Sequence, residues 1–412
     1  MSETKAIAIV GGGAAGFFAA IRYAQLMQQS NHQFQVHLFE GSGRFLQKVR
    51  ISGGGRCNVT HHDYNIRSFC SRYPRGQKEV LSPMHQFQAQ DLVQWFEKRG
   101  VALKVEEDGR MFPVTDSSET IIACLEKEAL ALGCKLHKNF FIESIVKKTF
   151  GFALNSRSGE TFEADKVLLA TGSQPVGYNI AKALGHAVTP LAPSLFSFVI
   201  ASPLLQELQG VSFPKASLLL EVGEKKKFRE ENPILITHWG LSGPGILKLS
   251  AWAAREMKQS QYRATLTVNW VGQAFGHVVD ELSQFRQNHP TAKLSNRALL
   301  GLTKRFWERV LMVAQISQDQ LFADLSNLQI QKIATCLTGC VFDVKGKNRF
   351  KDEFVECGGV DLKEIDMKTM QSKIVPGLFF AGEIMDVDGI TGGFNLQHAW
   401  TSGYVAGSNM AL

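Results

Sequence analysis

The stretch Ala6-Ile-Ala-Ile-Val10 followed by Gly11-Gly-Gly-Ala-Ala-Gly16 decides the fold of this chain. Its first five residues form a continuous apolar run, which is typical of a parallel strand buried on both faces. Apolar residues at helical spacing follow as far as Met27, and a second apolar run, Gln35-Val-His-Leu-Phe-Glu40, ends in an acidic residue. The order strand, glycine turn, helix, strand, acid predicts an α/β, Rossmann-like domain that binds a dinucleotide.

The three glycines of this turn have separate tasks. Gly11 permits a tight turn, Gly13 lets the backbone approach a pyrophosphate, and Gly16 lets the helix pack close to the strand. The pyrophosphate is expected at the helix N-terminus, where N–H groups and the positive end of the helix dipole favour an anion. The ribose of the adenosine is expected to donate hydrogen bonds to Glu40. The residues assigned to the dinucleotide here are Gly11, Gly13, Ala14, Ala15, Gly16 and Glu40.

Length and composition indicate a folded globular protein of two or three domains. The chain has 412 residues, of which 44% are hydrophobic and 20% charged, and this excludes disordered and collagen-like classes. No apolar window approaches the roughly 18 residues of a membrane span, so we expect a cytoplasmic protein without a membrane partner. The seven cysteines include no CxxC pair, so we predict neither a disulfide framework nor a metal site.

Positive charge is concentrated in one segment. The formal net charge is +7, and much of the excess falls between residues 44 and 78. This segment is expected to form either a solvated face or an anion-binding channel. Its basic residues are Arg44, Lys48, Arg50, Arg56, Arg67, Arg72, Arg75 and Lys78.

Three later segments favour FAD over NAD, which the N-terminal turn alone does not distinguish. Residues 165–172 and 377–383 are apolar strands that end in small or acidic residues, and residues 386–399 form a glycine turn that opens a last helix. This organisation is similar to that of flavoproteins whose C-terminal strand and helix complete the N-terminal nucleotide fold. The helix N-terminus near Gly393 is expected to stabilise negative charge on a reduced flavin. The sequence has no second GxGxxG, so we expect NAD(P)H only as a transient reductant.

Several further motifs carry a resemblance to a known family. They are Lys48-Val-Arg-Ile-Ser-Gly-Gly-Gly-Arg-Cys-Asn-Val-Thr60, Gly109-Arg-Met-Phe-Pro113, Pro190-Leu-Ala-Pro-Ser-Leu195, Thr237-His-Trp-Gly-Leu-Ser-Gly-Pro244, and Gly358-Gly-Val360 with Asp386 to Asn395. In their order and spacing the chain resembles the BaiN/HI0933-like (YhiN-like, aminoacetone-oxidase-like) family of FAD-dependent oxidoreductases. The resemblance implies a discontinuous Rossmann-like FAD-binding domain with an inserted β-barrel domain that carries a helical subdomain.

The sequence patterns agree with that division. The predicted β-rich runs are 216–222, 234–238 and 262–271, and the predicted helices are about 275–287, 296–315 and 327–338. The predicted domains are 1–190 with 345–412 for FAD, 191–274 with 335–344 for the β-barrel-like insert, and 275–334 for the helical subdomain.

The loop from Ser52 to Asn58 resembles the flavin-contacting segment of that family. Its glycines permit close backbone approach, and Lys48 and Arg56 are suited to neutralise a phosphate or a flavin carbonyl. Glu383 stands where such flavoproteins often have an Asp on the ribityl hydroxyls, and its longer side chain departs from that pattern. The further residues assigned to FAD are Lys48, Gly54, Gly55, Arg56, Cys57, Asn58, Thr171, Gly172, Gly382, Glu383, Asp388, Gly393, Phe394, Asn395 and Leu396.

Two residues are candidates for proton transfer in catalysis. Cys57 is either a proton-donating or charge-transfer thiol or a small buried hydrophobic residue. His238 is either a general acid over the substrate or a brace for the loop that follows it.

The resemblance implies an FAD-dependent oxidoreductase. We expect a reductase, fed by NAD(P)H, that delivers hydride from flavin N5 to a C=C bond of the enone or uracil type. One alternative is an rRNA-binding flavoenzyme that reduces uridine to dihydrouridine, with phosphates contacted by Arg72 and Arg75. Another is a flavin oxidase that acts on a small amine or aminoketone. The expected partner is therefore a small-molecule substrate or rRNA.

Overall fold

The chain folds into two compact units, each described here by itself. The computed structural model describes residues 5–224, 226–348 and 355–412. The first unit comprises residues 1–192 and 354–412, and the second comprises residues 193–353. The first unit is therefore built from both ends of the chain.

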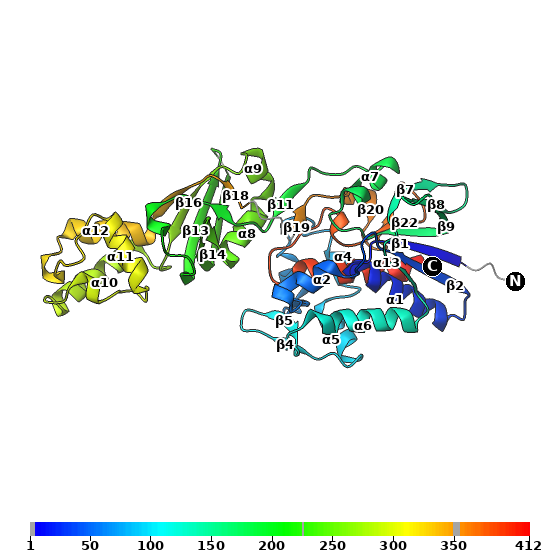
Figure 1. Ribbon diagram of the computed structural model, residues 1–412, viewed down its shortest axis with the longest axis horizontal. Coiled ribbons are helices and arrows are strands. Elements are labelled where there is room, and N and C mark those ends of the chain that lie inside the picture. The colour runs from blue at the N-terminus through cyan, green and yellow to red at the C-terminus, as the bar shows by residue number, and fades with distance from the viewer. Residues whose placement is uncertain (1–4, 225, 349–354) are drawn as a thin grey trace. The chain divides into compact units, whose positions relative to one another are not determined.

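A seven-stranded sheet forms the centre of the first unit (Figure 1). Its strands, in spatial order, are β20 (Ile365–Asp366), β21 (Gln371–Ser372), β22 (Leu378–Phe380), β10 (Lys166–Leu169), β1 (Lys5–Val10), β2 (Phe34–Phe39) and β6 (Lys135–His137). The strands from β22 to β6 are parallel, and β1 lies between β2 and β10. This order brings the C-terminal strand β22 within two places of the first strand, as a discontinuous Rossmann-like domain requires.

The first and last helices pack closely on one another. Helix α1 (Ala14–Gln29) follows the glycine turn, and helix α13 (Phe394–Met410) ends the fold. A Cβ atom on Gly403 would lie 2.4 Å from Ala15 O, and one on Gly407 would lie 2.5 Å from Ala19 O. Only glycine allows this approach, which fixes the C-terminal segment against the N-terminal turn.

Smaller elements complete the first unit. A three-stranded antiparallel sheet contains β3 (Thr60–His61), β5 (Arg110–Pro113) and β4 (Leu103–Val105). Another contains β7 (Ile142–Lys147), β8 (Phe152–Ser156) and β9 (Thr161–Ala164). The remaining helices are α2 (Gln47–Ile51), α3 (Ile66–Cys70), α4 (Leu81–Met84), α5 (Ala89–Glu97), α6 (Ser118–Ala131) and α7 (Pro175–Ala183), and a 3-10 turn, η6 (Gly382–Ile384), follows β22.

The second unit contains another seven-stranded sheet. Its order is β17 (Cys340–Val344), β16 (Ala264–Asn269), β13 (Ser212–Val222), β14 (Lys226–Thr237), β15 (Gly240–Ser242), β12 (Phe198–Val199) and β18 (Gly346–Lys347). Val344 pairs with β16 at one edge, while Gly346 pairs with β12 at the other. Two residues span at most about 8 Å, so the two edges meet here and the sheet closes as a barrel does.

Helices of the second unit share a buried core with this sheet. They are α8 (Pro244–Trp252), α9 (Ala254–Gln259), α10 (Phe275–Asn288), α11 (Lys304–Val313) and α12 (Asn327–Thr338). The ring of Trp270, which follows β16, lies 4.6 Å from Phe213 and 5.0 Å from Phe306 of α11, centroid to centroid. The separation of the helices into a subdomain of their own stays a prediction.

One predicted helix is shorter than expected. The pattern over 296–315 includes α11, which begins only at Lys304. The side chain of Thr303 caps this helix by accepting a hydrogen bond from Phe306 N. Leu300 and Gly301 before the cap have positive φ angles, which end a helical path.

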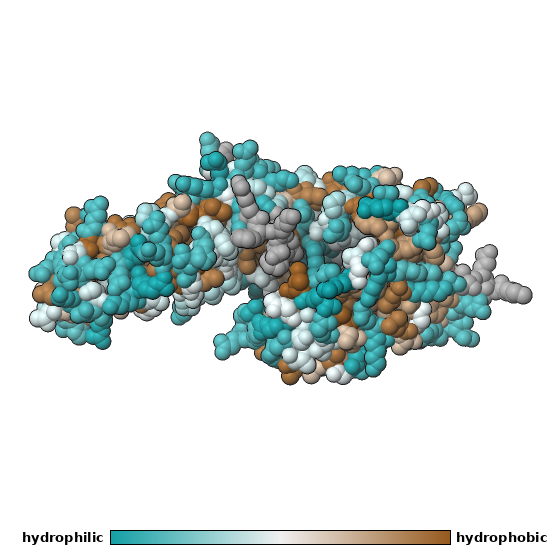
Figure 2. Space-filling model, viewed as in Figure 1, coloured by the Kyte–Doolittle hydropathy of each residue, from teal (hydrophilic) through white to brown (hydrophobic). Residues whose placement is uncertain are grey.

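Polar side chains cover most of the visible surface, with apolar side chains scattered between them (Figure 2). Away from the chain end, the most exposed large apolar residue described in the first unit is Phe150, which is 90% exposed. In the second unit it is Leu328, which is 64% exposed. Single exposed apolar residues are normal in folded proteins. Among the described residues, no helix combines the length and apolar character needed to cross a membrane.

Candidate functional site

The N-terminal glycine turn has room for a ligand at one position only. Gly11 has a φ of +115°, and a Cβ atom there would lie 2.2 Å from Ala170 O. A Cβ atom on Gly16 would lie 2.1 Å from Gly11 O. At Gly13, by contrast, a Cβ atom would have no neighbour within 4 Å. Gly11 and Gly16 are therefore required by packing, and the open side of the turn is at Gly13.

The carboxylate of Glu40 is held beside this turn. Its Oε2 accepts a hydrogen bond from Gly12 N at 3.0 Å, and its Oε1 accepts one from Ser42 N at 2.8 Å. The backbone N–H of Glu40 donates to His137 O at 2.8 Å. Each carboxylate oxygen keeps a second lone pair, so Glu40 remains able to accept hydrogen bonds from a ribose.

Two other segments lie against the N-terminal glycine turn: the Thr171-Gly172 turn after β10 and Gly382 after β22. A Cβ atom on Gly11 would lie 2.9 Å from Thr171 N, and one on Gly382 would lie 3.0 Å from Ala15 Cβ. A Cβ atom on Gly172 would lie 3.6 Å from Glu383 Oε2. The structure thus brings together three segments that the sequence singled out separately.

Lys48 and Glu383 form an ion pair across this region. Lys48 Nζ also donates to Ser173 Oγ at 3.0 Å, and Glu383 Oε1 accepts from Glu356 N at 3.0 Å. Glu383 therefore contacts Lys48 of helix α2, which lies 335 residues earlier in the chain. The Glu383 side chain, which is longer than that of Asp, makes these contacts with Lys48 and Glu356 N.

The loop from Ser52 to Asn58 is open at two glycines. Gly54 and Gly55 have φ angles of +71° and +87°, and a Cβ atom on either would have no neighbour within 4 Å. Cys57 is fully buried, and its N–H donates to Ser52 O at 3.0 Å. Burial raises the pKa of the Cys57 thiol to about 12, so the thiol is protonated at neutral pH. These features favour the packing alternative for Cys57.

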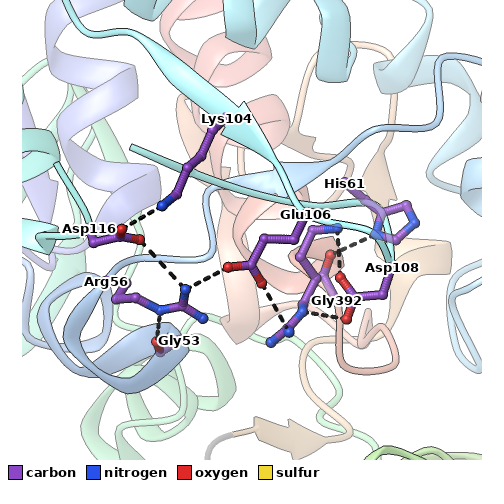
Figure 3. Close-up of polar contacts among 9 residues, drawn as sticks. Gly53, Arg56, His61, Lys104, Glu106, Asp108, Asp116 and Gly392 are labelled. Atoms are coloured by element: carbon purple, nitrogen blue, oxygen red, sulfur yellow. Dashed lines mark hydrogen bonds and ion pairs between the residues drawn. The ribbon is translucent and has the colours of Figure 1, made fainter. Parts of the chain in front are cut away.

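Arg56 is turned toward the β4–β5 hairpin (Figure 3). Its Nη1 lies 2.6 Å from Glu106 Oε1 and 3.5 Å from Asp116 Oδ1, and its guanidinium carbon lies 4.0 Å from the ring centroid of Phe112. Lys104 pairs with the same Asp116. The guanidinium charge is thus compensated by the protein, and the expected contact of Arg56 with a phosphate or a flavin carbonyl stays a prediction.

Two assigned residues at and before the start of α13, Asp388 and Asn395, also bond to the protein. Arg75 makes a bidentate contact with Asp388, with Nε 2.5 Å from Oδ1, and the two side chains are 10% and 0% exposed. The side-chain amide of Asn395 both donates to and accepts from the backbone of Gly389, at 2.8 Å each. The expectation that Arg75 contacts RNA phosphates is wrong, because its guanidinium is buried on Asp388.

The start of helix α13 is held by the strand β3. Gly393 has a φ of +95°, and a Cβ atom there would lie 2.5 Å from Thr60 O. In the amide orientation that satisfies both groups, Asn58 donates to Thr60 O at 3.2 Å and accepts from Gly393 N at 3.0 Å. His61 Nδ1 lies 3.1 Å from Gly392 O. The turn that precedes Phe394 and Leu396 is therefore rigidly placed.

Two buried polar atoms in this region lack a hydrogen-bond partner among the described residues. They are Thr171 Oγ1 and His398 Nδ1. The other ring nitrogen of His398 lies 3.3 Å from Gly382 O, and burial lowers the pKa of this histidine to about 4. Unpaired buried polar groups are costly, and a ligand is one means of pairing them.

The basic segment divides into paired and unpaired residues. Lys48, Arg50, Arg56 and Arg75 form ion pairs. For the other four, no carboxylate of the described residues lies within 4.0 Å; they are Arg44, Arg67, Arg72 and Lys78. About half of the segment therefore keeps its charge available to an anion or a carbonyl oxygen.

His238 belongs to the second unit. It is exposed in the loop that joins β14 to β15. Its role as a general acid stays a prediction.

Sequence reasoning missed the residues that hold Arg56 and the start of α13. Glu106 and Asp116 hold Arg56, and Tyr73 donates through its hydroxyl to Phe394 O at 2.7 Å. The only signal was the acidic run Glu106-Glu-Asp108 immediately before Gly109-Arg-Met-Phe-Pro113. Nothing in the sequence links that run to Arg56.

Comparison with known proteins decides the family. The family described as HI0933-like protein Rossmann domain matches residues 5–409. The chain belongs to the HI0933-like family. It is an FAD-dependent oxidoreductase, as the resemblance implied.

Relatives cover nearly the full length of this HI0933-like chain. The ribosomal RNA dihydrouridine synthase of Escherichia coli (strain K12) is 30% identical over 411 residues, which are 98% of this chain and 97% of that protein. The 3-dehydro-bile acid delta(4,6)-reductase of Clostridium scindens is 27% identical over 416 residues, 97% of this chain and 98% of that protein.

Solved structures share the fold at low sequence identity. The 3-ketosteroid-delta4-(5alpha)-dehydrogenase of Rhodococcus jostii RHA1 has a TM-score of 0.52 and 12% identity, and the match covers 100% of this chain and 98% of that one. The 3-ketosteroid delta1-dehydrogenase of Sterolibacterium denitrificans has a TM-score of 0.51 and 12% identity, with 99% and 100% covered.

The described residues fit FAD. Open space lies at Gly13, Gly54 and Gly55, where glycine lets a backbone approach a ligand. Thr171 Oγ1 is buried without a hydrogen-bond partner among the described residues, and it lies next to Gly177 of α7. The helix N-terminus at Ala14 supplies backbone N–H groups for a pyrophosphate.

Proposed function

We propose that this enzyme reduces a C=C bond conjugated to a carbonyl group and takes its electrons from NAD(P)H. The observation that carries the proposal is the chemistry shared by the two full-length relatives. A 3-dehydro bile acid with delta(4,6) unsaturation has its double bonds conjugated to a ketone. Dihydrouridine forms when the C5=C6 bond of uracil, which is conjugated to a carbonyl, is reduced. The sequence has no second GxGxxG, which supports transient binding of the nicotinamide.

Bound FAD would supply the hydride for this reaction. The chain itself would bind and orient the cofactor through the turn at Gly13, the carboxylate of Glu40 and the first turn of α13. We propose that Arg56, Asp388 and Asn395 support these groups and do not contact the cofactor themselves, because their side chains already bond to the protein. The domain boundaries and the assigned cofactor residues remain part of this proposal.

A panel of acceptors tests the proposed reaction. Holoenzyme reduced without oxygen is mixed with a steroid 4-en-3-one, with uridine, with a uridine-containing oligoribonucleotide, or with oxygen and aminoacetone. We expect rapid reoxidation by at least one conjugated acceptor and a saturated product. Oxygen consumption that depends on aminoacetone, without turnover of any conjugated acceptor, would replace the proposal with the oxidase alternative.

A second candidate function is reduction of uridine within rRNA. Dihydrouridine synthases of Escherichia coli and Haemophilus influenzae are 30% and 29% identical to this chain over nearly its full length. The exposed residues Arg44, Arg67 and Lys78, with no carboxylate of the described residues within 4.0 Å, provide positive charge for phosphates. Association with rRNA fragments should then weaken steeply as the salt concentration rises. Affinity that does not change with salt would reject this candidate.

His238→Asn tests the proposed proton donor. We expect acceptor-dependent reoxidation of the reduced enzyme to slow by about 100-fold, because a positioned acid contributes at least this much. Reduction of the enzyme by NAD(P)H should change little, and stopped-flow absorbance separates the two half-reactions. His277→Asn, at an exposed histidine on α10, is the matched control. Equal slowing of both half-reactions, or none, would leave His238 as a brace.

A further inference from the structure

The loop from Ser52 to Asn58 is open in its middle and held at its end. Gly54 and Gly55 have φ angles of +71° and +87°, and a Cβ atom on either would have no neighbour within 4 Å. Asn58, in the amide orientation that satisfies both groups, accepts a hydrogen bond from Gly393 N at 3.0 Å. Because glycine is the most permissive residue in backbone conformation, the open stretch needs a further contact to keep one conformation.

Arg56 connects this open stretch to the β4–β5 hairpin. Its Nε donates to Gly53 O at 3.4 Å, and its guanidinium carbon lies 4.0 Å from the ring centroid of Phe112. A Cβ atom on Gly53 would lie 2.7 Å from Phe112 Cε1, so the loop backbone rests on the same ring. The ring is fully buried. The side chain of Arg56 and the glycines before it therefore share one rigid support.

Glu106 fixes the direction of the Arg56 side chain (Figure 3). Its Oε1 lies 2.6 Å from Arg56 Nη1, and its Oε2 lies 3.1 Å from Arg110 Nη2. Its backbone is held in the hairpin, since Glu106 N donates to Arg110 O at 2.9 Å. Asp116 lies farther from Arg56 Nη1, at 3.5 Å, and also pairs with Lys104. Glu106 is therefore the principal counter-charge of Arg56.

We propose that Glu106 is a positioning residue for the bound flavin. By pairing with Arg56, it fixes the backbone at Gly54 and Gly55 and offsets a positive charge next to these glycines. A positive charge near a flavin favours the reduced form, which carries more negative charge, over the oxidised form. Glu106 thus keeps the reduction potential of the flavin lower than an unpaired Arg56 would. The inference rests on the proposed function, because it takes this loop as a contact of FAD.

The midpoint potential of the bound FAD tests this without any substrate. It is measured by equilibrium reduction of the holoenzyme against reference dyes. Glu106→Gln removes the charge and keeps the size of the side chain. We expect binding of reduced FAD relative to oxidised FAD to strengthen about 3- to 10-fold, which raises the potential of a two-electron couple by about 14–30 mV. Glu106→Asp, which keeps a carboxylate, should retain most of the wild-type potential.

Asp108→Asn is the matched control. It removes one negative charge from the same hairpin, but Asp108 Oδ2 accepts from Arg110 Nε, at 2.7 Å, and no ion pair among the described residues joins Asp108 to Arg56. Its potential should change less than half as much as that of Glu106→Gln. When Glu106→Gln is added to Arg56→Met, the shift should fall to the size seen for Asp108→Asn, because the guanidinium is no longer present.

Three results overturn the role of Glu106. The first is a potential that Glu106→Gln changes no more than Asp108→Asn does, and the second is a shift of full size in the Arg56→Met background. If Glu106→Gln purifies without FAD, the variant that also carries Arg56→Met decides, because it leaves no unpaired guanidinium. Recovery of FAD in that variant supports the role, and continued loss is the third result that overturns it.

The acceptor panel remains a separate test. Failure of every conjugated acceptor to reoxidise the reduced holoenzyme would overturn the proposed function. The midpoint potentials are equilibrium quantities of the enzyme without substrate, so they would stand unchanged.

Discussion

Gly13→Val is expected to yield a folded protein that holds no FAD. Gly13 has φ and ψ angles of −93° and −168°, which Val adopts without strain, and a side chain there meets no protein atom within 4 Å. The fold should therefore survive. The side chain would instead occupy the open side of the turn, where we place the pyrophosphate. Flavin absorbance of the purified protein and chromatography of the released cofactor measure the loss.

A glycine far from the turn provides the matched control. Gly346 lies in strand β18 of the second unit, and a Cβ atom there also has no neighbour within 4 Å. Gly346→Val should purify with a full complement of FAD. A folded Gly13→Val variant with the same FAD content as the wild type would show that the cofactor does not use this turn.

Arg75→Met is expected to destabilise the protein by about 3–5 kcal/mol. The substitution leaves the carboxylate of Asp388, which is 0% exposed, buried without its bidentate partner. The loop from Asp388 to Phe394 loses an anchor at the same time, so weaker retention of FAD should accompany the loss. Urea unfolding of the holoenzyme followed by circular dichroism measures the change in stability.

Two further variants provide comparisons for the loss of stability expected of Arg75→Met. Arg75→Met combined with Asp388→Leu removes both charges and should recover most of the lost stability, because no buried ion remains unpaired. Lys148→Met breaks the exposed ion pair with Glu163 and should cost far less stability than Arg75→Met, because solvent screens an exposed pair. If Arg75→Met costs no more than Lys148→Met, the buried pair does not anchor the loop.

Local patterns were sufficient to predict the nucleotide-binding core. The apolar run at β1, the turn from Gly11 to Gly16 and the acid Glu40 predicted strand, turn, helix and strand with their bounds nearly right. These elements depend on residues close together in the chain, whose steric and hydrogen-bonding requirements are local. The helix expected over 296–315 is shorter than expected for a local reason too, because positive φ angles at Leu300 and Gly301 and the cap at Thr303 delay its start.

The polar partners of the candidate site could not be predicted in this way. Arg56 and Asp388 were assigned to the cofactor by residue type, yet the structure pairs them with Glu106 and Arg75, residues 50 and 313 positions away. A charged side chain looks the same in sequence whether it faces a ligand or a carboxylate. Only the folded chain decides which, since it fixes which opposite charge lies within reach.

The sequence by itself determined the family, the class of cofactor and the elements that meet at the glycine turn, because these depend on motifs whose backbone geometry is encoded locally. Tertiary structure alone decided which side chains remain available for chemistry. Lys48, Arg56 and Arg75 are paired, whereas Arg72 and one nitrogen of His61 have no such partner among the described residues. Availability depends on distances between segments far apart in the chain, and no local pattern of residues contains those distances.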